Sequence, residues 1–500
     1  MAITNHSSDT SMRKNRLYST LIISLLAACS FAAPRLTVVA VVDGLTAENL
    51  ALLRPYWQQG GLRTLSEEAF QTSVAFPHLV YGGNETTATL VTGTTPDNHG
   101  YSMDRYFLRR DRQIHTMLED EDVRGIGTKL HLSPKALLSH SIPDRMRLLY
   151  PATKIYAVGI EPETTVLLAG HTANACCWID AETRQWVTTA AYTEGLPSSA
   201  FDYNKGGRFA ILAAKQWTPR MDVATYMRPT AQERKKSFSY VAGNVLKHAP
   251  EANTLVIELA LALQHDEKMG TDAIPDLLML QLNTLSPQAT SDAIESAEQE
   301  DMYLRLNQDL GYLMEQLDKR IGRANYQLLV VGRPVLGTSA ETLSDLHMPV
   351  QPFNTDRAAA LTSTYLMALY GHERWVDGCY GQSIYLNRPL IEQKRMSLET
   401  LQRQVANFLM DFEGVQIAMP GSEAMRYGLL GSSLCKRHTG DVVFMLQPGW
   451  RLMQDDKRVI DRVVDDNPLA PILLWSGTIR PMPQGTLSAT DVAELVIGNW

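Results

Sequence analysis

Residues 36–44 read Leu-Thr-Val-Val-Ala-Val-Val-Asp-Gly, and this stretch decides the fold class. The run is mainly apolar, without alternation, and rich in β-branched side chains, which is typical of a strand buried on both faces of a parallel sheet. Similar runs predict further strands at 154–160, 277–282, 327–331 and 471–475, and helical spacing predicts a long helix over 301–321. This alternation predicts an α/β fold, a three-layer α/β/α sandwich with a mostly parallel central sheet.

The composition is that of a folded chain with a small acidic excess. Of 500 residues, 45% are hydrophobic and 20% are charged, and 46 basic against 54 acidic side chains give a formal net charge of -8. A chain of this length buries a large core, and its hydrophobicity is too high for a disordered protein. The acidic balance also argues against a protein that coats nucleic acid, so we expect no nucleic-acid partner.

The first 33 residues have the order of a secretory signal peptide. A basic segment follows Met12, which is an alternative start, and an uncharged apolar stretch spans 17–28. Two cleavage sites compete: one lies after Ala32, and the other, of the bacterial lipoprotein type, would leave a lipidated Cys29 at the new amino terminus. We therefore expect an exported protein of the periplasm or the outer membrane, with membrane contact only through a lipid on Cys29.

Residues 34–500 are expected to form one domain with a cap insertion at about 176–250. That segment carries many aromatic side chains among polar residues and few long apolar runs. Ligands of open α/β sheets bind at the carboxyl ends of the strands, so we expect the cap to cover that edge.

Short motifs follow one another in a fixed order along the chain. Val-Val-Asp-Gly at 41–44 is followed by Thr-Thr-Ala-Thr-Leu-Val-Thr-Gly-Thr-Thr-Pro at 86–96 and His-Gly at 99–100, and Pro-Asp at 275–276 comes later. In this order the motifs resemble the alkaline phosphatase superfamily, near its secreted phosphatase and nucleotide pyrophosphatase/phosphodiesterase branches. The resemblance implies a two-zinc phosphoester hydrolase, in which a Thr or Ser attacks phosphorus and six Asp or His side chains at strand ends hold the metals.

The resemblance assigns metal-ligand positions that this sequence fills differently. Asp43 stands at the first ligand position and keeps a carboxylate. Arg333 and Pro334 replace an Asp-His pair, and Leu469 stands where the last histidine is expected. No Asp or His occurs in 283–290, where the family has a further Asp and His. A guanidinium offers no lone pair to a metal, so Arg333 is expected to form a salt bridge with Asp43 instead.

The resemblance also assigns a nucleophile and phosphate-binding groups. The nucleophile position aligns with Gly83, which has no side chain to attack with, and Thr86 and Thr87 lie nearby within an expected helix. Three positions that would face a phosphate carry Asp104, Glu161 and Glu163. The sequence therefore predicts negative charge where a phosphatase keeps positive charge.

Two functions are compatible with these residues. The first is a non-catalytic member of the superfamily, an exported binding or scaffold protein of the cell envelope whose partner is an unidentified envelope protein or ligand, and which needs no cofactor. The second is a metal-dependent phosphoester hydrolase with a displaced site, either with zinc, as the resemblance implies, or with an oxygen-liganded Mg²⁺ or Ca²⁺. Its candidate residues are Asp43, Glu85, Thr86, Asp104, Glu161 and Glu163.

Overall fold

The computed structural model describes residues 33–80, 83–231, 237–427, 432–454, 458–459, 468–477 and 485–497. The predicted signal peptide, with Met12 and Cys29, lies outside these residues, apart from its last position. No helix among the described residues is long and apolar enough to cross a bilayer.

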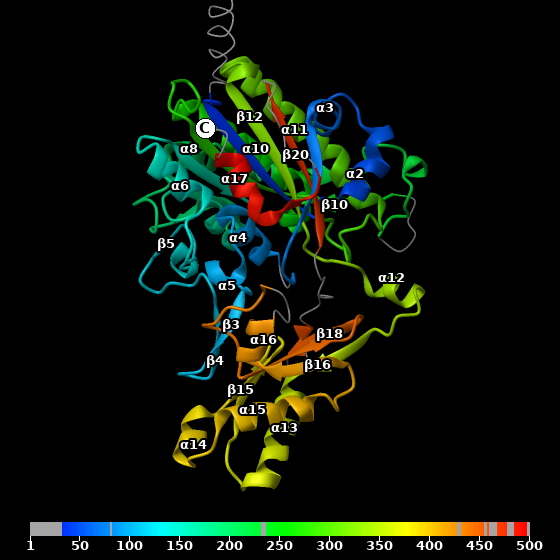
Figure 1. The fold of residues 1–500 in the computed structure, drawn as a ribbon. Coiled ribbons are helices and arrows are strands. Elements are labelled where there is room, and N and C mark those ends of the chain that lie inside the picture. Colours follow the sequence, from blue (N-terminus) through cyan, green and yellow to red (C-terminus); the bar gives the residue numbers. More distant parts are fainter. Residues whose placement is uncertain are drawn as a thin grey trace, which may run out of the picture.

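The main architectural element is a ten-stranded sheet with a parallel centre (Figure 1). Its strands run in the order β21-β2-β20-β12-β1-β11-β6-β7-β8-β5. Their bounds are β1 Leu36–Asp43, β2 Phe70–Ala75, β5 Gly125–Ile126, β6 Ile155–Gly159, β7 Ala175–Asp180, β8 Gln185–Thr189, β11 Asp276–Asn283, β12 Tyr326–Arg333, β20 Leu469–Ser476 and β21 Leu487–Ser488. The pairs β12-β1, β1-β11, β11-β6 and β6-β7 are parallel, whereas β20 is antiparallel to both of its neighbours. The predicted strands and the α/β class are thus confirmed.

Helices cover both faces of this sheet, as the non-alternating strands require. On one face lie α3 Gly61–Glu68, α8 Ser198–Lys205, α9 Arg208–Ala213, α10 Pro250–Asp266 and α11 Ala297–Arg320. On the other lie α4 Asn84–Thr92, α6 Ile142–Leu149, α7 Pro162–Ala169 and α17 Val492–Ile497. The long helix predicted over 301–321 is α11, which begins four residues earlier. Its capping residue is Ser296, whose side chain accepts a hydrogen bond from Gln299 N.

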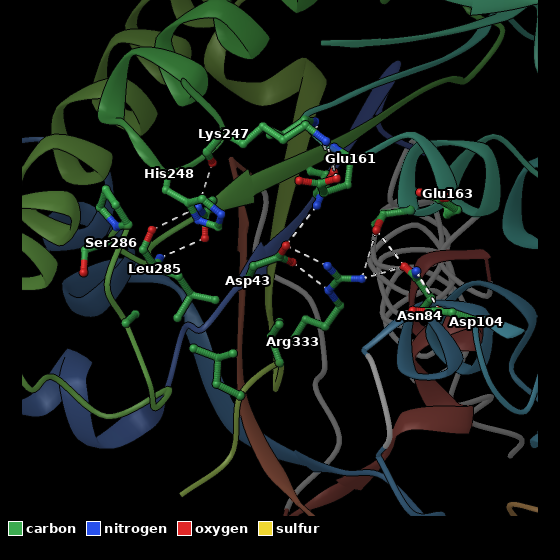
Figure 2. Close-up of a pocket in the computed structure, with 18 of the residues that line it drawn as sticks. Asp43, Asn84, Asp104, Glu161, Glu163, Lys247, His248, Leu285, Ser286 and Arg333 are labelled. Atoms are coloured by element: carbon green, nitrogen blue, oxygen red, sulfur yellow. Dashed lines mark hydrogen bonds and ion pairs between the residues drawn. The ribbon is translucent and has the colours of Figure 1, made fainter. Parts of the chain in front are cut away.

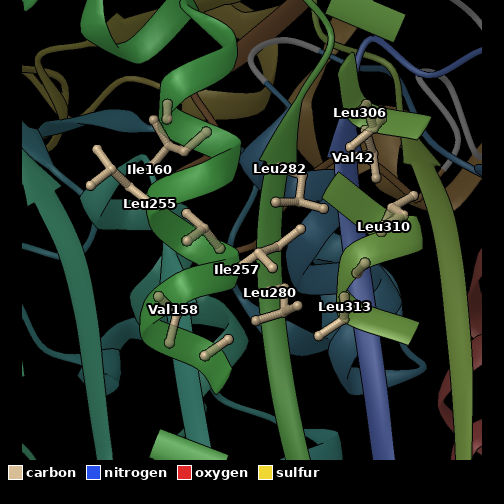
Figure 3. Packing of buried hydrophobic residues seen from close by; sticks show 14 of the residues in the cluster. Val42, Val158, Ile160, Leu255, Ile257, Leu280, Leu282, Leu306, Leu310 and Leu313 are labelled. Atoms are coloured by element: carbon tan, nitrogen blue, oxygen red, sulfur yellow. The ribbon is translucent and has the colours of Figure 1, made fainter. Parts of the chain in front are cut away.

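The side chains of β1 divide between two cores. Val38, Ala40 and Val42 belong to the cluster beneath α10 and α11, and Val39 and Val41 to the cluster beneath α4 and α7. Figure 3 shows the first cluster, with Val42 and Leu280 from the strands packed against Ile257 of α10 and Leu310 of α11. A two-sided buried strand explains why residues 36–42 show no polar alternation.

The segment 176–250, for which we predict a cap, contributes strands to the main sheet and aromatic side chains to one of its cores. It supplies β8 and most of β7, and its buried aromatic side chains Trp186, Phe209 and Trp217 join the core beneath α10. It also holds the short strands β9 Gln216–Trp217 and β10 Tyr240–Val241, which pair with each other. The boundary of a separate cap stays a prediction.

A second region, between residues 351 and 459, has its own sheets and its own core, which the sequence patterns did not distinguish. One sheet has the order β14-β15-β17-β16 and another β13-β18-β19. Their bounds are β13 Gln351–Asn354, β14 Val376–Tyr380, β15 Ser383–Leu386, β16 Val415–Pro420, β17 Val442–Leu446, β18 Trp450–Gln454 and β19 Arg458–Val459. Helices α13 Thr355–Tyr370, α14 Arg388–Gln393, α15 Leu398–Leu409 and α16 Gly421–Tyr427 accompany them. Figure 1 shows this region, in yellow and orange, below the main sheet.

Candidate functional site

The candidate site lies where the carboxyl ends of three central strands meet. In the register of the sheet, Asp43 at the end of β1 stands between Asn283 of β11 and Arg333 of β12. Ligands of open α/β sheets bind at this edge, and a cavity of about 460 Å³ opens here. Asp43, Asn283 and Arg333 all line this cavity, which we call the edge cavity.

Asp43 and Arg333 form a buried, two-point ion pair at the floor of the edge cavity (Figure 2). Nε of Arg333 donates to Oδ1 of Asp43 and Nη2 donates to Oδ2, each at 2.6 Å. Arg333 is 3% exposed and Asp43 is 6% exposed. The predicted salt bridge is confirmed, and it engages both oxygens of the Asp43 carboxylate.

The third nitrogen of Arg333 holds two helices against the strand ends. Nη1 donates to Asn84 Oδ1 at 3.0 Å, Thr87 Oγ1 at 3.1 Å and Thr164 Oγ1 at 3.0 Å. Asn84 and Thr87 begin α4, and Thr164 lies in α7. Burial alone would lower the pKa of Arg333, but the Asp43 carboxylate raises it above its ordinary value, so the guanidinium stays charged.

The position predicted for a nucleophile faces Arg333 and has no side chain. Gly83 precedes α4 with a φ of +92°, and a Cβ atom there would lie 3.6 Å from Cζ of Arg333. The hydroxyl of Thr86 donates to the carbonyl of Gly83, and that of Thr87 accepts from Arg333. Both threonines are fully buried and neither lines the edge cavity.

The structure brings the three predicted carboxylates into the edge cavity, in three different environments. Asp104 accepts hydrogen bonds from Asn84 Nδ2 and from the Tyr101 hydroxyl, each at 2.9 Å. Glu161 pairs with Lys247 Nζ at 2.6 Å. Glu163 is half-buried and accepts from its own backbone N–H, and among the described residues it pairs with no other side chain. Its burial and the neighbouring Asp104 and Glu161 carboxylates raise its pKa.

Two of the predicted positions do not line the edge cavity. Leu469 begins β20, is 60% exposed and does not line the edge cavity. Pro334 follows Arg333 directly, and its carbonyl oxygen lies 3.4 Å from where a Cβ of Gly83 would be. Among the described residues, no group of three or more His, Cys, Asp or Glu side chains is arranged to hold a metal ion.

Two further residues of the site were missed by sequence reasoning. Gln281 of β11 donates from Nε2 to Asp43 Oδ2 at 2.9 Å, and its Oε1 accepts from the backbone N–H groups of Ile160 and Glu161. Gln281 is an isolated polar residue in the apolar run 277–282, and a buried polar side chain needs hydrogen-bond partners, so the sequence did contain a signal for its role. Lys247 gave no such signal, because a lysine in a polar segment is ordinary.

Comparison with known proteins finds similar sequences over most of the chain. The family model described as type I phosphodiesterase / nucleotide pyrophosphatase matches residues 37–467. A protein named calcium-transporting ATPase from Myroides odoratus is 24% identical over 466 residues, covering 85% of this chain and 84% of that protein. Alkaline phosphatase PafA from Elizabethkingia meningoseptica is 23% identical over 398 residues, covering 74% of this chain and 72% of PafA.

Solved structures show the same fold. The crystal structure of wild-type PafA superposes with a TM-score of 0.81 at 20% sequence identity, and the match covers 93% of this chain and 96% of that one. The resemblance to the alkaline phosphatase superfamily and the predicted fold class are thereby confirmed.

Proposed function

Since the chain belongs to the type I phosphodiesterase / nucleotide pyrophosphatase family, within the alkaline phosphatase superfamily, we propose that it is a member without phosphoester hydrolase activity, exported to the cell envelope, where it binds a ligand or partner. One observation carries the proposal. The guanidinium of Arg333 engages both oxygens of Asp43 at 2.6 Å, in the place where the resemblance puts a metal.

The residues present do not fit a pair of zinc ions. Zinc in proteins is held by several thiolate, imidazole or carboxylate ligands, and the affinity of the site for zinc is the combined contribution of all of them. Here the strand ends offer Asp43, whose oxygens are already bound, together with the neutral amide of Asn283 and the cation of Arg333. A guanidinium has no lone pair and repels a metal cation, so this donor set supports a site without zinc.

The lack of a presented nucleophile among the described residues supports the same proposal, as does the pairing of Lys247 with Glu161 and of Arg333 with Asp43. Gly83 has no side chain, and the hydroxyls of Thr86 and Thr87 are buried in bonds to the backbone and to Arg333. The unpaired charge of the edge cavity includes Glu163, which would repel a phosphate dianion. Acyl and phosphoryl transfer both need groups that stabilise developing negative charge, and the edge cavity offers few.

The displaced-site hydrolase remains the second candidate because Asp104 and Glu163 line one cavity and interact electrostatically. Carboxylate oxygens are the ligands that Mg²⁺ and Ca²⁺ prefer.

Export is proposed from the segment 1–33, and fractionation of cells that produce the full chain should recover the processed protein in the envelope fraction. Mass spectrometry of its amino terminus distinguishes a lipidated Cys29 from cleavage near Ala32.

The decisive experiment measures metal content and turnover on the purified mature protein. We expect substoichiometric zinc by elemental analysis and no hydrolysis of aryl phosphate monoesters or diesters with Zn²⁺, Mg²⁺ or Ca²⁺ added, under conditions in which PafA is active. Stoichiometric metal with turnover that is lost in Asp43→Ala would overturn the proposal. Turnover with Mg²⁺ that survives Asp43→Ala but is lost in Glu163→Gln would favour the displaced site.

A further inference from the structure

The end of the main sheet opposite the edge cavity carries exposed aliphatic side chains. We call it the amino edge, because the parallel strands β1, β6 and β11 begin there. Leu148 and Leu149, at the end of α6, are 69% and 56% exposed, and Ile274, just before β11, is 37% exposed. A single exposed leucine needs no explanation, but apolar side chains that gather on one surface mark a contact with another molecule or a membrane.

Hydrogen bonds hold the end of α6 against the start of β11. Arg147, next to the two leucines, donates from Nη1 to the carbonyl oxygens of Pro151 and Thr153. The hydroxyl of Thr153 donates to the carbonyl of Pro275, which directly follows Ile274. The exposed aliphatic side chains therefore belong to connected segments of one surface.

Exposed cations lie on the same surface. The carbonyl of Arg35 accepts from the backbone N–H of Asp276 at 2.9 Å, and the carbonyl of Lys268 accepts from Lys154 Nζ at 3.4 Å. Asp272 lies 3.9 Å from Lys154, whereas the exposed side chains of Arg35 and Lys268 have no carboxylate partner within the part of the chain that the structure describes. Cations beside apolar side chains suit a bilayer that contains anionic lipids.

The chain enters the main sheet at this edge. Pro34 is buried, and β1 begins two residues later. A lipid on Cys29, one of the two predicted forms of the amino terminus, would be attached five residues before Pro34, a distance of at most about 17 Å in an extended chain. The edge cavity lies about 26 Å farther away, at the other end of the eight-residue strand β1. Figure 1 shows the start of β1, in dark blue, at the end of the main sheet away from the second region.

We propose that the amino edge is a membrane-contacting surface, on which Leu148, Leu149 and Ile274 enter the headgroup region of the bilayer that holds the lipid on Cys29. This inference rests on the proposed function, because it requires export to the envelope. A lipid and a protein surface together anchor a chain more firmly than a single acyl chain does. The short tether keeps the amino edge at the bilayer, and the edge cavity then opens toward the aqueous compartment.

A fluorescent label that brominated lipids quench tests which end of the molecule meets the bilayer. The four described cysteines are buried, so a thiol introduced at an exposed position is labelled selectively in the folded protein. Ala152→Cys places the label at the amino edge, and Leu346→Cys places it at the end of α12 Ala340–Asp345, which lies beside the second region in Figure 1.

The processed protein is reconstituted with vesicles of phosphatidylethanolamine and phosphatidylglycerol, with or without brominated phosphatidylcholine. We expect brominated lipid to lower the emission of the label at 152 about twofold or more, because an apolar surface of this kind enters the bilayer by about 5–10 Å. The emission of the label at 346 should stay unchanged.

The role of the leucines is tested by adding Leu148→Gln and Leu149→Gln to the Ala152→Cys protein. Quenching at 152 should fall by about half or more, because the amides remove the aliphatic contact with the bilayer. The matched control is Leu346→Gln, which removes a leucine that is 65% exposed and lies away from the amino edge, and it should leave quenching at 152 unchanged. Exposed side chains contribute little to stability, so the variants should keep the fold, and thermal unfolding checks this.

The outcomes separate this inference from the proposed function. Equal quenching at the two labels, no quenching at 152, or quenching that the double leucine variant leaves unchanged would overturn the membrane surface alone. Cleavage near Ala32 without a lipid would also overturn it, because no tether would remain. Recovery of the chain outside the envelope fraction, or release of phosphate from aryl phosphates, would instead count against the proposed function.

Discussion

At the scale of single residues, Arg333 organises the edge of the sheet. Its three nitrogens reach Asp43 on β1, Asn84 and Thr87 on α4, and Thr164 on α7. A metal ion would join strand ends and helices through lone pairs, whereas the guanidinium joins them by donating hydrogen bonds. At a metal site the surrounding side chains would give lone pairs to a cation in this position, and here they accept hydrogen bonds from the cationic guanidinium instead.

Arg333→Met should destabilise the protein strongly, because it leaves the buried Asp43 carboxylate unpaired. Removing one partner of a buried pair costs about 3–5 kcal/mol, and urea unfolding measures this loss. The double variant Arg333→Met with Asp43→Leu should recover a large part of it, since no buried charge remains. The control Arg357→Met, at an exposed arginine, should unfold as the parent does. A loss below about 1 kcal/mol in Arg333→Met would contradict the expected role of the pair.

At the scale of elements, the contact between α10 and α11 contains acidic side chains that the sequence pattern did not distinguish. Asp309 of α11 accepts a hydrogen bond from Thr254 of α10 at 3.1 Å, and Glu251 and Glu258 of α10 lie close enough to interact with it. Burial, with a contribution from these two carboxylates, raises the pKa of Asp309 to about 7. Its charged form is therefore unfavourable in the folded state.

Asp309→Asn should stabilise the protein at neutral and alkaline pH. Because the pKa is near 3.8 in the unfolded chain and about 7 in the fold, the native state binds the extra proton. The free energy of unfolding therefore falls as the pH rises from about 4 to 7. The amide removes this penalty, and a gain of about 1–3 kcal/mol is expected at pH 8, with little change at pH 4.

Thermal unfolding across this pH range checks the prediction. Asp202→Asn, at an exposed position of α8, is the control and should not alter the pH profile. An Asp309→Asn gain that is the same at both pH values would mean that the titration of this carboxyl is not its cause.

At the scale of the whole molecule, a hairpin connects the edge cavity to the second region. Its strands are β3 Arg105–Leu108 and β4 Gln113–Thr116, and Figure 1 shows them extending from the main sheet toward that region. Arg109 donates to Asp441 at 2.6 Å, and the ring centroids of Tyr106 and His438 are 4.2 Å apart. Asp441 is fully buried and also accepts from Arg388 and from the backbone N–H of Leu386.

Asp441→Asn should loosen the second region without unfolding the main sheet. The amide loses its charge-assisted bonds to two arginines, which costs about 2 kcal/mol locally. Limited proteolysis with mass mapping should then show faster cleavage within 351–454, whereas residues 33–330 stay intact. Asp345→Asn, at an exposed position of α12 Ala340–Asp345, is the control. First cleavage in the main sheet would contradict the expected local effect.

Much of the fold could be predicted from the sequence because its signals are local. Uninterrupted apolar runs mark strands buried on both faces, and the helical period of α11 marks the layer that covers them. Asp43 and Arg333 both end such runs, so the parallel register that aligns β1 with β12 makes them neighbours. The second region escaped prediction because its strands are short and carry mixed patterns.

By itself, the sequence determined the α/β sheet, the strand-end position of Asp43 and Arg333, and the glycine at position 83. The tertiary structure decided which charges are compensated. Lys247 reaches Glu161 across 86 residues, and Gln281 bonds both to Asp43 and to the backbone of residues 160–161. Strand ends are fixed by local hydrophobicity, but pairing between distant side chains depends on the register of the sheet and the packing of helices upon it.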